Sequence, residues 1–159
     1  AYAMTGWRIG YATAPEPFLS AMKKLHQYLI MSAPTMGQHA ALRALQYGEA
    51  DVMHMQQEYD RRRRLIVDGF NHLGMATFEP RGAFYAFPSI QHTGMTSTEF
   101  CDLLLKEQRL AMIPGDAFGA SGAGFIRASY ASSEENIHNA LERLALFLQT
   151  HGFLKAVAV

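Results

Sequence analysis

Apolar residues recur at helical spacing through the first half of the chain. Positions three and four residues apart predict helices over 18–31 and 35–47, and a longer helix over 49–73. In the first of these helices the apolar positions are Phe18, Met22, Leu25 and Leu29. Thr35 is a candidate N-cap of the second helix, and Gly74 follows the end of the third. The third helix would be about 35–40 Å long, which suits an element that links two domains.

Short apolar and aromatic stretches, bounded by Gly and Pro, predict four strands. They cover residues 7–12, 82–88, 110–113 and 125–131. Three of them follow the long helix; one helical pattern separates the first two of these three, and another follows the last. The second half is therefore expected to be an α+β arrangement, in which helices cover a small sheet.

Two helices of the second half begin with capping sequences. Thr96-Ser97-Thr98-Glu99 is a capping box, in which the Thr side chain accepts a backbone N–H and the Glu side chain reaches back. Ser132-Ser133-Glu134-Glu135 is interpreted as a second capping box. It opens a terminal helix that is expected to end at Gly152.

These patterns divide the chain into three parts. Residues 1–48 offer one strand and two helices, which cannot form a sheet of their own, so they are interpreted as the end of a larger domain. Residues 49–74 form the linking helix, and residues 75–159 form a small C-terminal domain. The first part should expose apolar surface that the rest of its domain would cover, and this predicts self-association or disorder there.

Composition narrows the class of protein. Hydrophobic residues make up 49% and charged residues 18% of the 159 positions, which is typical of a globular protein. No apolar run reaches the ~20 residues of a membrane span, so no membrane association is expected. The 14 basic residues balance the 14 acidic ones, which disfavours a nucleic-acid partner. Cys101 is the only cysteine, and a cytoplasmic location is the simple inference.

The basic run Arg61-Arg62-Arg63-Arg64 does not change this interpretation. Four successive residues spread around most of a helix, and Glu58 and Asp60 lie nearby as partners. The run is therefore interpreted as a solvated helix face. The seven histidines show no metal-ligand spacing, so no metal site is expected.

Four motifs follow one another in a fixed order. They are Met4 to Tyr11 (MTGWRIGY), Pro80 to Pro88 (PRGAFYAFP), Ile113 to Gly119 (IPGDAFG) and Phe125 to Ala131 (FIRASYA). This set resembles the fold-type-I, class I aminotransferases that depend on pyridoxal 5'-phosphate, and the resemblance covers essentially the whole chain. It makes residues 1–48 a C-terminal remnant of the large cofactor-binding domain, and residues 75–159 the small domain of that family.

The resemblance assigns roles to two arginines. Arg8 matches the arginine of the family that binds the phosphate of the cofactor, and Arg127 matches the arginine that binds the carboxylate of the substrate. A planar guanidinium can hold two oxygens of either group at once. The Schiff-base lysine of the family would lie just before Ala1, so no catalytic residue is expected in this chain. Phe118 is expected to shape a loop near the substrate pocket, and Tyr85 to lie mostly in the core.

The resemblance also implies an activity for the full-length parent. It would be a homodimeric aminotransferase that transfers an amino group from an amino acid to a 2-oxo acid, whereas the chain alone is expected to be inactive. Two alternatives remain open. One is an aminotransferase-like effector domain of a transcription regulator, and the other is a different fold-type-I reaction, such as β-elimination or acyl-CoA condensation. Arg127 fits transamination and these other reactions alike, because each of them handles an amino-acid carboxylate.

Overall fold

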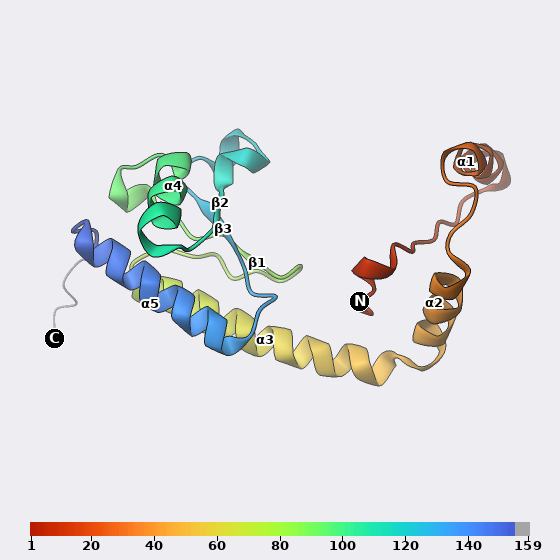
Figure 1. The fold of residues 1–159 in the computed structure, drawn as a ribbon, viewed down its shortest axis with the longest axis horizontal. Helices are drawn as coiled ribbons and strands as arrows, with labels where there is room; N and C mark the ends of the chain where they lie inside the picture. The colour runs from red at the N-terminus through yellow and green to blue at the C-terminus, as the bar shows by residue number, and fades with distance from the viewer. Residues whose placement is uncertain (155–159) are drawn as a thin grey trace. The chain divides into compact units, whose positions relative to one another are not determined.

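The computed structural model describes residues 1–154, which form two compact units. The division falls between Gln56 and Gln57, inside the long helix α3, which spans Glu49–His72. Figure 1 shows the elements of both units along the chain. The helix predicted over 49–73 is confirmed by α3, while the domain boundaries drawn at residues 48 and 74 stay a prediction.

The first unit consists mainly of two helices. α1 (Glu16–Leu29) and α2 (Thr35–Tyr47) confirm the helices predicted over 18–31 and 35–47. Pro15 and Pro34 occupy their N-cap positions, and neither helix has a side-chain cap. The expectation that Thr35 caps α2 is wrong, because Thr35 is already its first helical residue. The fixed φ of proline suits the residue that leads the chain into a helix.

The strand predicted over 7–12 is wrong. Thr5–Trp7 forms a 3-10 helix, Arg8 follows it with a left-handed φ of 52°, and no strand occurs in residues 9–15. A strand is stable only when its backbone N–H and C=O groups pair with a neighbouring strand. The first unit has no other strand among its residues, all of which are described, so this segment has no partner within the unit.

The helices of the first unit leave apolar side chains in solvent. Phe18, Leu25 and Leu29 of α1 are 67%, 64% and 77% exposed. Among residues 1–56, only Gly37 and Gly48 are buried. The expectation that the first part of the chain exposes apolar surface is confirmed.

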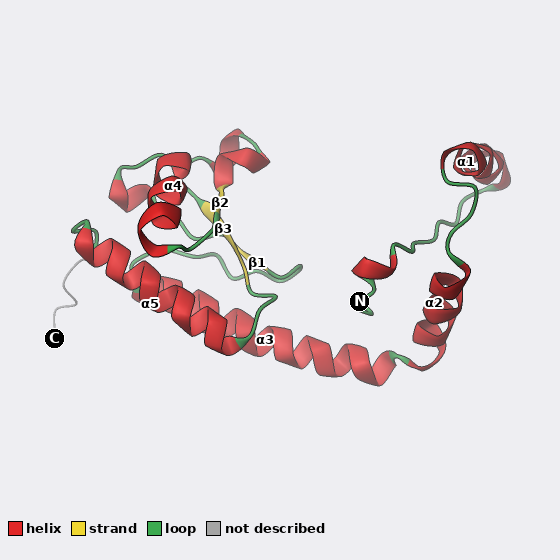
Figure 2. Ribbon diagram, in the orientation of Figure 1, coloured by secondary structure: helices red, strands yellow, loops and turns green. Residues whose placement is uncertain are grey.

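A small antiparallel sheet organises the second unit. β3 (Ile126–Ser129) lies between β1 (Tyr85–Ala86) and β2 (Ile113–Pro114). Tyr85 pairs with Ser129 on one side, and Ile113 pairs with Arg127 on the other. Each of the three strands lies within or beside the stretch predicted for it but is shorter than that stretch. The α+β class expected from the sequence is confirmed, and Figure 2 shows the strands among the helices.

Two further helices pack in this unit, α4 (Ser97–Gln108) and α5 (Glu134–Thr150). The capping box of α4 is confirmed, since the Glu99 backbone N–H donates to Thr96 Oγ1 at 3.3 Å and the Thr96 N–H donates to Glu99 Oε2 at 3.1 Å. The second capping box is wrong. Ser133 alone caps α5, by accepting from the Asn136 N–H, and the residue three positions after this cap is Asn136 instead of an acid.

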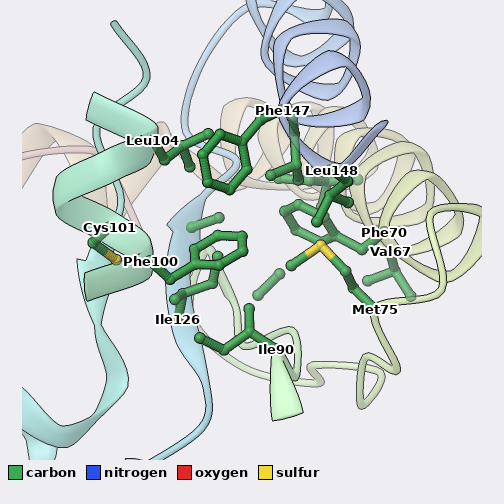
Figure 3. Close-up of a cluster of buried hydrophobic side chains, with 14 of the residues drawn as sticks. Val67, Phe70, Met75, Ile90, Phe100, Cys101, Leu104, Ile126, Phe147 and Leu148 are labelled. Atoms are coloured by element: carbon green, nitrogen blue, oxygen red, sulfur yellow. The ribbon is translucent and has the colours of Figure 1, made fainter. Parts of the chain in front are cut away.

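One hydrophobic core holds the second unit together (Figure 3). The rings of Phe100 from α4 and Phe147 from α5 meet edge to face, 5.2 Å apart. Burial raises the pKa of the Cys101 thiol to about 11, so this thiol stays protonated as a small core residue. The core residues come from α3, α4, α5, the strands and the loops: Ile66, Val67, Phe70, Met75, Ala86, Ile90, Phe100, Cys101, Leu104, Ile126, Ala128, Tyr130, Ile137, Leu144, Phe147 and Leu148.

Candidate functional site

Arg8 stands in an open position of the first unit. It follows the 3-10 helix Thr5–Trp7, and its Nη1 donates to the carbonyl oxygen of Thr5 at 3.1 Å. The side chain is exposed and has no acidic partner within residues 1–154. A guanidinium has five N–H donors, so most of those of Arg8 remain available for an anion.

Arg127 lies on β3, the central strand of the second unit. Its neighbours Ile126 and Ala128 are buried in the core, at 0% and 7% exposure. Side chains alternate across a strand, so Arg127 and Ser129 lie on the opposite face of the sheet. The buried face of β3 thus packs on the core through Ile126 and Ala128, and the opposite face carries Arg127.

Two aromatic rings flank the Arg127 guanidinium. Its Cζ lies 4.3 Å from the centre of the Tyr85 ring and 4.1 Å from the centre of the Phe118 ring. Tyr85 is on β1, and Phe118 ends the 3-10 helix Gly115–Phe118, which directly follows β2. β1 and β2 lie on opposite sides of β3, so the two rings come from elements on both sides of the strand that carries Arg127. A cation over a ring face is attracted by the ring's quadrupole.

The side chain of Arg127 has no hydrogen bond or ion pair within the described part of the chain, residues 1–154. The arginines of α3 differ, because every one of them pairs with acids. Arg61 and Arg62 pair with Glu58, Arg61 also pairs with Glu134, Arg63 pairs with Asp60 and Glu79, and Arg64 pairs with Asp60. The hydrogen bond from Arg63 lowers the pKa of Asp60, which keeps that carboxylate charged. The pairing expected for the basic run is confirmed, whereas the expected solvated face holds only for Arg61 and Arg64, because Arg62 and Arg63 are partly buried.

The two arginines singled out by the sequence lie in different units, Arg8 in the first and Arg127 in the second. Sequence reasoning placed Phe118 in a loop near the substrate pocket but missed the contact of Tyr85 with Arg127, since it placed Tyr85 mostly in the core, whereas Tyr85 is only partly buried. The strand register would have indicated the contact between Tyr85 and Arg127, because Tyr85 pairs with Ser129, which lies two residues from Arg127 on the same face of the sheet. That register becomes known only once the sheet is seen.

A separate apolar cavity of about 250 Å³ lies among α3, β3, α5 and residues 110–112. Its lining includes Phe70, Met112, Ala128 and Ile137, with no charged side chain. Arg127 is not part of it. The cavity therefore offers mostly packing surface and no charged group for an anion. In the described residues, no three His, Cys, Asp or Glu side chains come together as metal ligands, and no helix is long and apolar enough to cross a membrane.

Comparison with known proteins identifies the family of this chain. The profile of the family described as aminotransferase class I and II matches residues 1–144, so the chain belongs to this family. It is 50% identical over 148 residues to the Bacillus subtilis (strain 168) protein YugH, matching 93% of this chain and 38% of that protein. It is 42% identical over 150 residues to an aspartate aminotransferase of Pyrococcus abyssi, matching 93% of this chain and 39% of that enzyme.

A solved structure agrees with the fold. The crystal structure of an aromatic aminotransferase from Pyrococcus horikoshii OT3 superimposes with a TM-score of 0.91 at 42% identity, over 95% of this chain and 41% of that one. The chain thus spans about two fifths of the length of the relatives that it matches. Members of the family use pyridoxal 5'-phosphate. The family resemblance and fold class predicted from the sequence are confirmed.

Proposed function

We propose that this chain is the part of a pyridoxal-phosphate-dependent aminotransferase that binds the cofactor's phosphate and the substrate's carboxylate. The complete polypeptide would transfer an amino group from an amino acid to a 2-oxo acid. Arg8 would hold the phosphate, and Arg127 would hold the α-carboxylate of both substrates. The homodimer and the cytoplasmic location expected from the sequence remain part of this proposal.

The observation that carries the proposal is the state of Arg127. Its guanidinium is partly buried and flanked by rings, yet no carboxylate of the described chain neutralises it. A partly desolvated charge without a partner favours an anionic ligand more than an exposed, paired arginine does. A planar fork of N–H donors matches the two oxygens of a carboxylate.

The residues of the first unit fit the cofactor's phosphate. Arg8 donates one hydrogen bond to the carbonyl oxygen of Thr5, and its other N–H groups remain available. A Cβ added at Gly6 or Gly10 would meet no atom within 4 Å. The backbone beside Arg8 is therefore open to a bulky anion. When bound, pyridoxal phosphate supplies an electron sink for chemistry at the substrate's Cα. In that reaction Arg8 would fix the cofactor through its phosphate, and Arg127 would orient the substrate through its carboxylate.

The names of the relatives favour transamination over the alternatives. They include aspartate aminotransferases, an aromatic-amino-acid aminotransferase and a (5-formylfuran-3-yl)methyl phosphate transaminase. Because these named substrates differ, the family does not define the amino acid used here. Nothing in the named relatives points to a transcription regulator, to β-elimination or to acyl-CoA condensation.

Arg127→Lys in the complete aminotransferase polypeptide tests the proposal. Lysine keeps the positive charge but loses the planar fork, so kcat/KM for the amino acid and for the 2-oxo acid should each fall about 100-fold. The amount of bound pyridoxal phosphate, measured by absorbance, should not change. Arg64→Lys is the matched control, since Arg64 is exposed and paired with Asp60 on α3. If both variants keep wild-type kcat/KM, Arg127 does not bind the carboxylate.

A further inference from the structure

The Arg127 guanidinium is held in place by rings instead of by hydrogen-bond acceptors. In the described residues, its contacts are the faces of Tyr85 and Phe118. An acidic neighbour would fix an arginine equally well, but it would also occupy its N–H donors and cancel its charge. A ring face attracts the cation and leaves the N–H bonds, which lie in the guanidinium plane, unoccupied.

Each of these two rings is itself supported by further rings. Tyr85 packs on Phe84 with ring centres 4.8 Å apart, and Phe84 stacks on Tyr59 of α3 at 6.0 Å. Phe118 meets Phe87 at 6.1 Å, edge to face. Tyr85 and Phe118 therefore belong to two separate ring clusters, and each has an aromatic neighbour that restricts its rotation.

The loop that carries Phe118 is closed by backbone contact. The Gly115 N–H donates to the carbonyl oxygen of Phe125 at 2.9 Å. A Cβ added at Gly115 would collide with the carbonyl oxygen of Gly122, and a Cβ at Gly122 would collide with that of Gly115. Only glycine permits the two backbone segments to approach this closely. The crossing restrains the backbone of the 3-10 helix Gly115–Phe118, from which the Phe118 ring extends over Arg127.

We infer that Tyr85 and Phe118 are positioning residues that hold the Arg127 guanidinium between two ring faces, so that it accepts flat carboxylates edge-on and rejects tetrahedral oxyanions. The inference rests on the proposed function, in which Arg127 binds the substrate carboxylate. A carboxylate places both oxygens in the guanidinium plane. A phosphonate has a third oxygen outside that plane, and this oxygen would point toward a ring face, whose negative quadrupole repels it.

The test measures binding of two simple probes, propionate and ethylphosphonate, to the complete aminotransferase polypeptide loaded with its cofactor. The two probes share an alkyl group, and at a pH below the second ionisation of the phosphonate both heads carry one negative charge and differ mainly in shape. Ligand-observed NMR titration gives both dissociation constants without any turnover. We expect wild-type protein to prefer propionate by about tenfold, and Phe118→Leu and Tyr85→Leu each to remove most of that preference.

Conservative variants separate a positioning role from damage to the fold. Phe118→Tyr and Tyr85→Phe keep a ring over the guanidinium and should retain the wild-type preference. Phe78→Leu is the matched control, because Phe78 is an aromatic residue of the same unit that is 79% exposed and lies on no arginine. It should also behave as wild type. An unaltered probe preference in Phe118→Leu and Tyr85→Leu, or an equal loss in Phe118→Tyr, would overturn the inference.

Arg127→Lys distinguishes this inference from the proposed function. If this variant binds propionate as tightly as wild type does, Arg127 is not the carboxylate site, and the proposed function fails together with the inference. If Arg127→Lys weakens propionate binding while the ring variants keep the wild-type preference, the proposed function stands and only the positioning role of the rings is wrong.

Discussion

The two units use their apolar residues in opposite ways. In the second unit, helices and sheet bury a shared core in which Phe70, Phe100 and Phe147 are at most 1% exposed. In the first unit, α1 has an equally periodic apolar face, yet Phe18 and Leu25 are more than 60% exposed. Periodicity thus predicts which face of a helix is apolar. Burial depends on something else, namely whether the same chain supplies the elements that cover that face.

Truncating a large side chain should distinguish the units most clearly. Phe100→Ala leaves a cavity in the core and should lower the free energy of unfolding by about 3–5 kcal/mol. Phe18→Ala removes the same group from the exposed face of α1 and should change that free energy by less than about 0.5 kcal/mol. Chemical denaturation followed by near-UV circular dichroism measures both variants. Equal losses would show that α1 is covered in solution and would remove the contrast between the units.

Backbone packing should give the next largest difference. At Gly115 in the second unit, a Cβ would collide with the Gly122 carbonyl oxygen, while at Gly10 in the first unit it would meet no atom within 4 Å. Gly115→Ala should therefore lower the free energy of unfolding by about 1–3 kcal/mol, as overpacking does. Gly10→Ala should stay within about 0.5 kcal/mol of wild type. Thermal unfolding compares them, and a neutral Gly115→Ala would show that the two backbone segments do not meet.

The helices could be predicted from sequence because their signals are local. The stop after α3 is set by neighbouring residues, and so is the capping box at Thr96 and Glu99. The strands were harder, because a strand is defined by its partner. The segment at 7–12 has a strand-like composition but no neighbour to pair with in its unit, so it does not form one. The sheet of the second unit was located correctly, although its strands are shorter than predicted.

In the candidate site, too, the features that are local in sequence could be predicted, and those that depend on contacts between distant residues could not. Arg8 and Arg127 stand out in the sequence because each lies in a contiguous motif that resembles the family, and their binding roles stay a prediction. Phe118 was expected near the substrate pocket, but the contact of its ring and of the Tyr85 ring with Arg127 does not follow from sequence, because these residues lie 9 and 42 positions away from Arg127. Their contact follows from the register of β1 against β3 and from the loop after β2. A slip of one residue in that register would move Tyr85 to the other face of the sheet.

Helix starts provide the smallest contrast between the units. α4 and α5 begin with side-chain caps, Thr96 and Ser133, whereas the N-cap residues of α1 and α2 are prolines without a side-chain hydrogen bond. Thr96→Ala leaves the Glu99 N–H without its acceptor, so it should lower the free energy of unfolding by about 1 kcal/mol. Thr35→Ala at the start of α2 makes the same substitution but removes no capping hydrogen bond, so it is the matched control. Urea denaturation would contradict the contrast if both variants lost the same stability.

Glu99 gives the α4 cap a dependence on pH. Hydrogen bonds from the hydroxyl and from the backbone N–H of Thr96 hold the pKa of Glu99 below its ordinary value of 4.5. A carboxyl group whose pKa is lowered by folding stabilises the fold above its unfolded pKa, and this contribution is lost as the pH falls through the folded pKa. Glu99→Gln keeps a capping side chain but removes the titration. Its free energy of unfolding should therefore fall less than that of wild type between about pH 5 and pH 3.

Glu135→Gln, in the first turn of α5, is the control, because Glu135 takes no part in the Ser133 cap. If Glu99→Gln loses stability with acid as steeply as wild type does, the charge on Glu99 does not contribute to the cap.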